Sequence, residues 1–345
     1  MRLLRHLAAS GLLCLSMACG GPAEPLASPT AEVVPVAPSA GLLFAAPRRL
    51  ARATVPPALV ASSAGVPVRV AQRCSASALP PGTVSLAAAW AGRGPGFYAL
   101  TQGPGHATLI RLTGSGCELA PWLGYFQTEV AVTPPLLAAG RRGYAFVVED
   151  SAVHEVSARG VETTAGPFRN VSSLAVSPTE RRLVVSTCGA WQVLERQGNA
   201  WEEHAALTQA ARTVDATGRA LPLDDERLAI LDEHGVVRVV SAAGVTATFD
   251  ATLDGEKPST DSLALCGADE GPALSATVLC LSYPERGVSA RWTGEGALVD
   301  VITVAGLAPE QRVTGVVKDL SGNGGGVHVL LRSAAGLSLA YLPEP

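Results

Sequence analysis

Residues 172–196 read SSLAVSPTERRLVVSTCGAWQVLER, and this stretch decides the fold. Short apolar runs follow one another in it, separated by turns that contain proline or glycine. Pro178 stands near the front of the first turn, where its fixed φ favours a β-turn. We therefore expect strands at 172–177, 182–187 and 192–196, with an outer fourth strand at 201–207.

Similar apolar runs return along the chain at a nearly regular interval. The starts of successive runs lie 47, 39, 45, 50 and 49 residues apart. A period in the forties with several strands per unit is typical of a β-propeller, whereas a two-sheet sandwich shows no such long repeat. The clearest runs are residues 97–100, 144–148, 183–186, 228–231, 278–281 and 327–331.

The two ends of the repeat predict how the ring closes. The last unit supplies strands at 312–318, 327–332 and 336–342 but no fourth strand. A strand-like alternation at 66–72 precedes the first inner strand at 83–88. If this early strand completes the last blade, neither end leaves a long bare edge.

We predict an all-β chain in which residues 66–345 form a β-propeller, with six blades as the preferred count. The inner strands of the second and fourth units, near 130–137 and 214–221, have the weakest patterns. A ring of seven blades is therefore the alternative.

One unit resembles a known family of repeats. The run LAVSP at 174–178, followed by RRLVVS at 181–186, resembles the apolar-Ser-Pro-Asp-Gly-Lys-apolar signature of WD40-like and TolB-like propeller blades. Thr179 and Glu180 replace the Asp-Gly pair, and the match covers one blade. The resemblance implies the fold and is silent about activity.

The N-terminus has the pattern of an export signal over residues 1–18. A short basic region precedes an apolar run at 7–15, which is too short for the ~20 residues that span a bilayer. The stretch LSMACG at 15–20 resembles the lipobox of bacterial lipoproteins, although Ser16 stands where leucine is usual. The resemblance implies a lipid (palmitate-bearing) anchor on Cys19 and a place in the cell envelope, at the outer membrane if the cell has one. The alternative is an ordinary secretory signal, which would leave the protein periplasmic or secreted.

Residues 19–65 predict a disordered tether between this anchor and the propeller. Prolines are scattered through the segment among alanine, serine and valine, without the period of a helix or a strand. Such a composition favours extended, semi-rigid backbone.

Five cysteines follow the anchor segment, and in an exported protein these form candidate disulfides. Cys266 and Cys280 are expected on adjacent strands, and Cys74 with Cys117 would join the start of the domain to its first blade. Cys188 is then left over, and a buried, inert thiol is its expected role.

The sequence contains none of the motifs that bind phosphate, dinucleotides or zinc, and no nucleophile elbow. None of the mature chain's histidines lies within four residues of another, so we predict no metal site. The acidic turns 224–226 and 232–233 are interpreted as exposed, solubilising hairpin tips. We name no catalytic residue and no cofactor, and a net charge of −4 argues against nucleic acid.

Aromatic residues are the remaining candidates for recognition, although most of the five tryptophans are expected in the core. Trp122, Tyr125 and Phe126 are the candidate binding surface, because they are expected in the connection between the first and second units. The preferred function is an envelope lipoprotein whose propeller binds a protein or a glycan. A glycan lyase or hydrolase and a structural envelope component are the alternatives.

Overall fold

The computed structural model of the chain describes residues 60–61, 66–75, 79–89, 96–103, 106–128, 136–140, 143–149, 151–157, 159–187, 190–214, 218–267, 278–318 and 326–343. For residues 121–128 it describes the backbone only. These residues are mostly strands, accompanied by the helix α1 (Ala205–Thr213) and the short 3-10 helix η2 (Thr260–Ser262). All of them belong to one unit of the chain, Val55–Pro345.

Four sheets consist of four antiparallel strands each, joined in chain order. The first contains β3 (Thr83–Ala89), β4 (Gly96–Gly103), β5 (His106–Ser115) and β6 (Glu118–Thr128). The second contains β7 (Leu137–Ala139), β8 (Ala145–Glu149), β9 (Ala152–Ser157) and β10 (Gly160–Ala165). The third contains β11 (Val171–Val176), β12 (Arg182–Thr187), β13 (Ala190–Gln197) and β14 (Ala200–Glu203). The fourth contains β15 (Arg219–Pro222), β16 (Arg227–Leu231), β17 (Val236–Ser241) and β18 (Gly244–Asp250).

The remaining strands form a nine-stranded sheet in which two such meanders are joined by the N-terminal strand β2 (Pro67–Arg73). One meander contains β19 (Ala264–Gly267), β20 (Val278–Tyr283), β21 (Val288–Thr293) and β22 (Leu298–Val304). The other contains β23 (Arg312–Lys318), β24 (Val327–Ser333) and β25 (Gly336–Leu342). The two-residue strand β1 (Val60–Ala61) pairs with β2.

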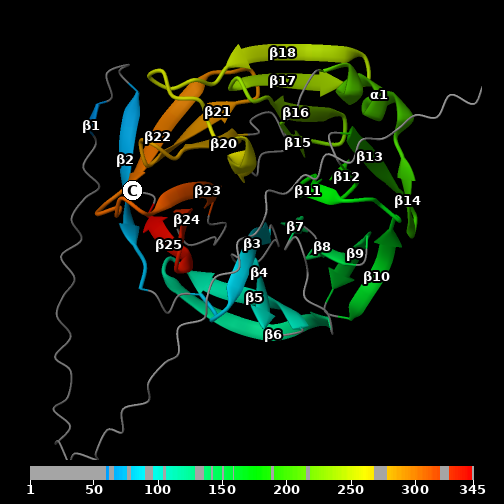
Figure 1. The fold of residues 1–345 in the computed structure, drawn as a ribbon, viewed down its shortest axis with the longest axis horizontal. Helices are drawn as coiled ribbons and strands as arrows, with labels where there is room; N and C mark the ends of the chain where they lie inside the picture. The colour runs from blue at the N-terminus through cyan, green and yellow to red at the C-terminus, as the bar shows by residue number, and fades with distance from the viewer. Residues whose placement is uncertain are drawn as a thin grey trace, which may run out of the picture. The chain divides into compact units, whose positions relative to one another are not determined.

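The sheets are arranged as the blades of a β-propeller (Figure 1). The first strands of the meanders lie toward a common centre, and strands such as β6, β10, β14 and β18 lie at the rim. The inner strand β7 contacts β3 and β11, β11 contacts β15, and β25 contacts β3. We call each meander a blade, number the blades along the chain, and refer to β23–β25 with β2 as the last blade. The number of blades stays a prediction.

The apolar core is divided among the seams, by which we mean the interfaces between neighbouring blades. Leu231 of the fourth blade packs with Leu281 of the fifth, and Phe146 of the second packs with Leu183 of the third. Second strands are buried on both faces because a blade lies on each side, as the fully buried β16 residue Ile230 illustrates. Burial on both faces requires continuous rather than alternating apolar residues. That requirement produces the repeated apolar runs of the sequence.

Outer strands are protected from pairing with other chains. The register of β6, β10, β18 and β22 against their neighbours is interrupted by bulges, β14 has only four residues, and β22 is in addition covered by β2. Bulges and short edge strands discourage edge-to-edge association. The exposed valines of the described residues, Val161, Val245 and Val299, all lie on these bulged strands.

The N-terminal strand pairs with the last blade, as expected, and it also pairs with the fifth blade. It pairs with the last blade only where Gln72 and Arg73 face Tyr341 and Ala340 of β25, in antiparallel register. Its preceding residues, Val68 to Ala71, pair in parallel with β22 of the fifth blade. One short parallel pairing and one short antiparallel pairing thus let this strand join the fifth blade to the last blade.

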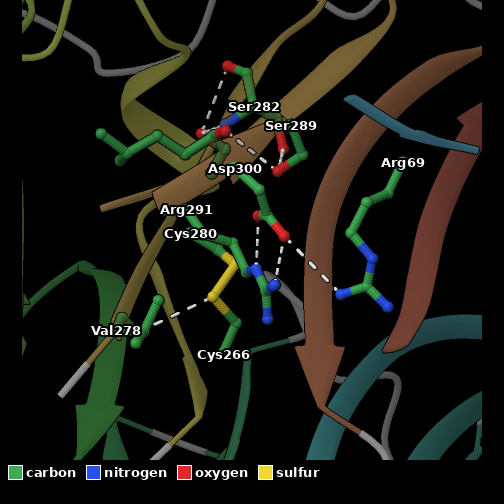
Figure 2. Close-up of a disulfide and its surroundings, with 10 residues drawn as sticks. Arg69, Cys266, Val278, Cys280, Ser282, Ser289, Arg291 and Asp300 are labelled. Carbon is green, nitrogen blue, oxygen red and sulfur yellow. Dashed lines mark hydrogen bonds and ion pairs between the residues drawn. A yellow bond between two sulfur atoms is a disulfide. The ribbon is translucent and has the colours of Figure 1, made fainter. Parts of the chain in front are cut away.

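Buried charges reinforce this closure (Figure 2). Asp300 of β22 accepts a 2.6 Å hydrogen bond from Nε of Arg291, its cross-strand partner, and a second bond from Nη2. On the other side of the carboxylate lies Arg69 of β2, with its Nη1 3.6 Å from Oδ2. Because the Asp300 side chain is only 5% exposed, these charges interact with little screening by solvent.

Two disulfides lie near the same closure. Cys74, directly after β2, is bonded to Cys117 in the last turn of the first blade, with a Cα–Cα distance of 5.2 Å. Cys266 and Cys280 join the first two strands of the fifth blade, with a Cα–Cα distance of 5.6 Å (Figure 2). Cys188 lies outside the described residues.

One expected strand was placed wrongly. The outer strand of the third blade ends at Glu203, and the residues assigned to its end begin α1. Leu207, Ala210 and Ala211 have helical spacing and pack between the third and fourth blades, which favours the helix over the strand. The inner strands β7 and β15 overlap the expected ranges 130–137 and 214–221, of which residues 130–135 and 215–217 lie outside the described residues.

We expect the substitution Asp300→Asn to lower the free energy of unfolding by about 3–5 kcal/mol, because it leaves two largely buried arginines without a counter-charge. Urea denaturation measures the loss. Glu203→Gln is the matched control: its ion pair with Arg212 is 3.8 Å long and more than two-fifths exposed on both sides, so it contributes under about 1 kcal/mol. Equal losses in the two variants would contradict the role given to Asp300.

Candidate functional site

The centre of the ring is the place where all blades meet, and the inner strands line it (Figure 1). The inner strands β3, β7, β11, β15, β19 and β23 contain no aspartate, glutamate or histidine. Their charged residues are Arg219, Arg312 and Lys318. These strands therefore bring no pair of acid and base groups to the centre.

Two faces of the ring follow from the antiparallel order of each blade. Turns between first and second strands, and between third and fourth strands, lie at one end of the blade; we call this the turn face. Turns between second and third strands share the opposite end with the connections between blades, and we call this the connection face. Candidate surface residues can thus be assigned to a face from topology alone.

On the turn face, Ser177 of the SPTE turn has a structural role. Its Oγ accepts hydrogen bonds from the backbone N–H groups of Arg181 (3.2 Å) and Arg182 (3.1 Å), which fixes the turn. Ser177 and Thr179 also donate to Asp225, which lies in the corresponding turn of the fourth blade. The blade signature thus stabilises its own hairpin and the neighbouring seam.

Glu180 completes this turn with a φ of 59° and a side chain that is 1% exposed. Its side chain lies against Gly140 of the second blade, where a Cβ atom would be 2.0 Å from Cγ of Glu180. Gly140 is therefore required by the close approach of two blades. Two residues further along the chain, Nη1 of Arg182 lies 2.7 Å from Oε1 of Glu195. The hydrogen bond between these side chains lowers the pKa of the Glu195 carboxyl.

The acidic hairpins were expected to be exposed, solubilising tips, but two of their carboxylates also have a structural role. Asp224 accepts backbone hydrogen bonds from Glu226 (2.8 Å) and Arg227 (2.7 Å). Asp232 is 4% exposed and accepts from the N–H groups of His234 and Val236, at 2.9 Å each, and from Arg238 at 2.6 Å. Both carboxylates hold a turn in place.

Each seam between blades that the structure describes also contains a polar link. Glu155 is fully buried and accepts from Arg196 at 2.6 Å and from Trp201 at 3.3 Å, both in the next blade. The other links are Tyr98 to Gly143, Ser177 to Asp225, Tyr283 to Ala251, Arg69 to Asp300, and His328 to Gly116.

Sequence reasoning did not find these links, although a signal for several of them exists. The pairs Glu155–Arg196, Tyr98–Gly143 and Ser177–Asp225 are 41, 45 and 48 residues apart, which is one repeat. Polar residues separated by one period therefore mark the contact between successive blades.

The histidines have different surroundings and do not converge. His328 is buried, with Nε2 2.6 Å from the Gly116 carbonyl oxygen and its ring between those of Phe97 and Tyr341. His204 caps α1, because its Nδ1 accepts from the N–H of Leu207. No group of three metal-ligating side chains occurs in the described parts of the chain.

The aromatic candidates lie on a strand. Trp122, Tyr125 and Phe126 belong to β6, the outer strand of the first blade, and not to the connection after it. An extended alternation in ELAPWLGYFQT accounts for the strand, and it overrides the loop that was expected. Their side chains lie outside what the structure describes. Trp191 and Trp292 are buried core residues, and Trp90 is outside the described residues.

The residues assigned to export and anchoring, including Cys19, lie outside the described residues. Within the part of the chain that the structure describes, no helix has the length and hydropathy needed to cross a membrane.

Comparison with known proteins finds similar arrangements only among solved structures. The sequence matches no protein-family model and no curated protein. The WD40 β-propeller domain of Doa1 is 11% identical, with 78% of this chain and 96% of that chain covered and a TM-score of 0.44. Raptor from Chaetomium thermophilum is 12% identical, with coverage of 77% and 25% and a TM-score of 0.47. Hsv2 from Kluyveromyces lactis is 14% identical, with coverage of 68% and 67% and a TM-score of 0.43.

Asp232 gives the fold a testable dependence on pH. Burial disfavours its charged form, but the hydrogen bonds from Val236, Arg238 and His234 outweigh this and lower its pKa. A lowered pKa in the folded state means that the carboxylate stabilises the fold at neutral pH and that this contribution is lost as pH falls through that pKa. We expect Asp232→Asn to cost about 1–3 kcal/mol at pH 7 and progressively less below the ordinary aspartate pKa of about 3.9. Urea unfolding curves across pH measure both; a cost that is constant with pH would refute the assignment.

Proposed function

We propose that this chain is an exported, lipid-anchored protein of the bacterial cell envelope, and that one face of its propeller binds another protein. The observation that carries the proposal is where the carboxylate and imidazole side chains lie and which groups hold them. The inner strands supply no carboxylate or imidazole, and buried carboxylates such as Glu155 and Asp300 are held by neighbouring arginines. What this arrangement offers is a rigid, turn-rich surface rather than a set of reacting groups.

Rigid turns support binding because a preformed surface loses little conformational entropy when a partner docks. The turn face has the fixed hairpins at Ser177 and Asp224, and it exposes Arg181 and Glu226 beside them. The connection face exposes Glu233 and Glu285 in its own tight turns. Charged side chains on such turns influence which partners are accepted.

The anchor is tested by metabolic labelling with radioactive palmitate in a bacterial host. We expect the full chain to incorporate label and Cys19→Ala to lose it, because a lipoprotein is acylated on the first cysteine of the mature chain. Cys14→Ala is the control and should label normally, since residue 14 lies inside the removed segment. Label that persists in Cys19→Ala would refute the anchor.

The binding face is tested in two steps. The partner is first identified by cross-linking in cells, and its affinity for the purified protein is then measured. We compare Arg181→Glu with Glu226→Arg on the turn face against Glu233→Arg with Glu285→Arg on the connection face. Reversal of charges on the correct face should weaken binding about tenfold or more, while the other pair changes it little.

Two results would contradict this function. One is that both double variants bind the partner with equal affinity. The exposed charges of neither face would then belong to the interface. The other is turnover of an envelope glycan by the purified protein, which would make the chain an enzyme.

A further inference from the structure

Arg219 stands out among the residues at the centre of the ring. It is the first residue of the inner strand β15, directly after the connection from the third blade, and its register partner is Leu231. Topology therefore places it at the connection-face end of the centre. Its side chain keeps partial access to solvent, although protein atoms surround the guanidinium closely enough for desolvation to lower its pKa.

The hydrogen bonding of Arg219 is incomplete. Nη1 donates to the backbone oxygen of Asp261 in η2, but the buried Nε has no hydrogen-bond partner. Among the residues that the structure describes, no carboxylate forms a salt bridge with Arg219. A desolvated guanidinium is normally paired, because an uncompensated buried charge is costly. The other arginines of the core illustrate this, since Arg196 and Arg291 each contact a carboxylate.

The guanidinium nitrogens of Arg219 that remain available define which ligand fits. Nη1 is engaged, so the pairing edge left to the guanidinium is the one formed by Nε and Nη2. That edge presents two parallel N–H donors, which match the two oxygens of a carboxylate. One negative charge balances one guanidinium, whereas a phosphate dianion would add a second charge close to the acidic residue Asp261.

We propose that Arg219 binds a carboxylate delivered to the centre of the ring from the connection face. The proposal rests on the function proposed above and names the chemistry of the partner: an acidic side chain or a chain terminus inserted at the centre. Arg312, the first residue of the inner strand β23, lies at the same end of the ring, and β23 contacts η2. Its positive charge favours the approach of an anion. The acidic residues of the two neighbouring connections are Asp254, Glu256 and Asp261 after β18, and Glu310 after β22.

The test uses the purified protein and three variants. Arg219→Met removes the charge with a similar shape, Arg219→Lys retains the charge without the two-pronged edge, and Arg159→Met removes an exposed arginine of the turn face as control. The probes are sodium acetate, with sodium chloride at equal ionic strength, and a short peptide rich in aspartate and glutamate, with its asparagine and glutamine counterpart. Calorimetric titration and the shift in melting temperature are the measurements.

We expect the acidic peptide to bind the unmodified protein and Arg159→Met alike, and to bind Arg219→Met at least about tenfold more weakly. Arg219→Lys should fall between them. Binding of the peptide without acetate assigns the site to a carboxylate on a partner chain, and binding of both assigns it to free carboxylates as well. Without probe, Arg219→Met should melt no lower than the unmodified protein, because it removes a desolvated charge that forms no salt bridge among the described residues.

Equal affinity of the acidic peptide and its amide counterpart, or unchanged affinity in Arg219→Met, would overturn the proposal. These failures are separable from failure of the proposed function. If charge reversal on one face abolishes binding of the cellular partner and Arg219→Met does not, the proposed binding face is supported and the role of Arg219 is not. Conversely, if a carboxylate binds through Arg219 but no protein partner is found in cells, the Arg219 site is supported and the proposed function of binding another protein is not.

Discussion

The structure depends on burial of the second strand of each blade between two neighbours. Residues such as Phe146, Leu183 and Ile230 are almost fully buried, and each is covered from a neighbouring sheet. A blade on its own would expose one or both of these apolar faces to water, which costs roughly 25 cal/mol for each Å² of apolar surface. No blade is therefore stable alone, and the stability of each depends on the ring being closed.

Polar links give the seams a defined alignment that apolar packing alone does not. Side chains of similar volume can pack at several offsets, whereas Glu155 satisfies Arg196, Trp201 and Thr163 at one relative position of its two blades. The same reasoning applies to His328 against Gly116 and to Asp300 between two arginines. Because the links occur at successive seams, an error in one blade would be opposed by both of its neighbours.

The features that could be predicted from the sequence are those that repeat. The continuous runs at 97–100 and 228–231 mark strands buried on both faces, so the strands and the propeller arrangement followed from periodicity. Features that occur only once were missed. The helix α1 comes directly after a strand pattern at Trp201, and it is a helix because Leu207 packs between two blades. The bridging role of β2 depends on a register with β22 that no local pattern encodes. For the candidate site, Arg219 gave no signal, because burial without a partner is visible only in three dimensions.

The bridging strand also has a mechanical consequence. The strand β2 hydrogen-bonds to two blades, and the chain then reaches Cys74. A pull on the N-terminus would load those hydrogen bonds together with the ion pair of Arg69, and any peeling would stop at the covalent bond to Cys117. The load would then pass through this disulfide to the first blade. The first long strand of the described domain is thus held by hydrogen bonds to two blades, by an ion pair and by a disulfide.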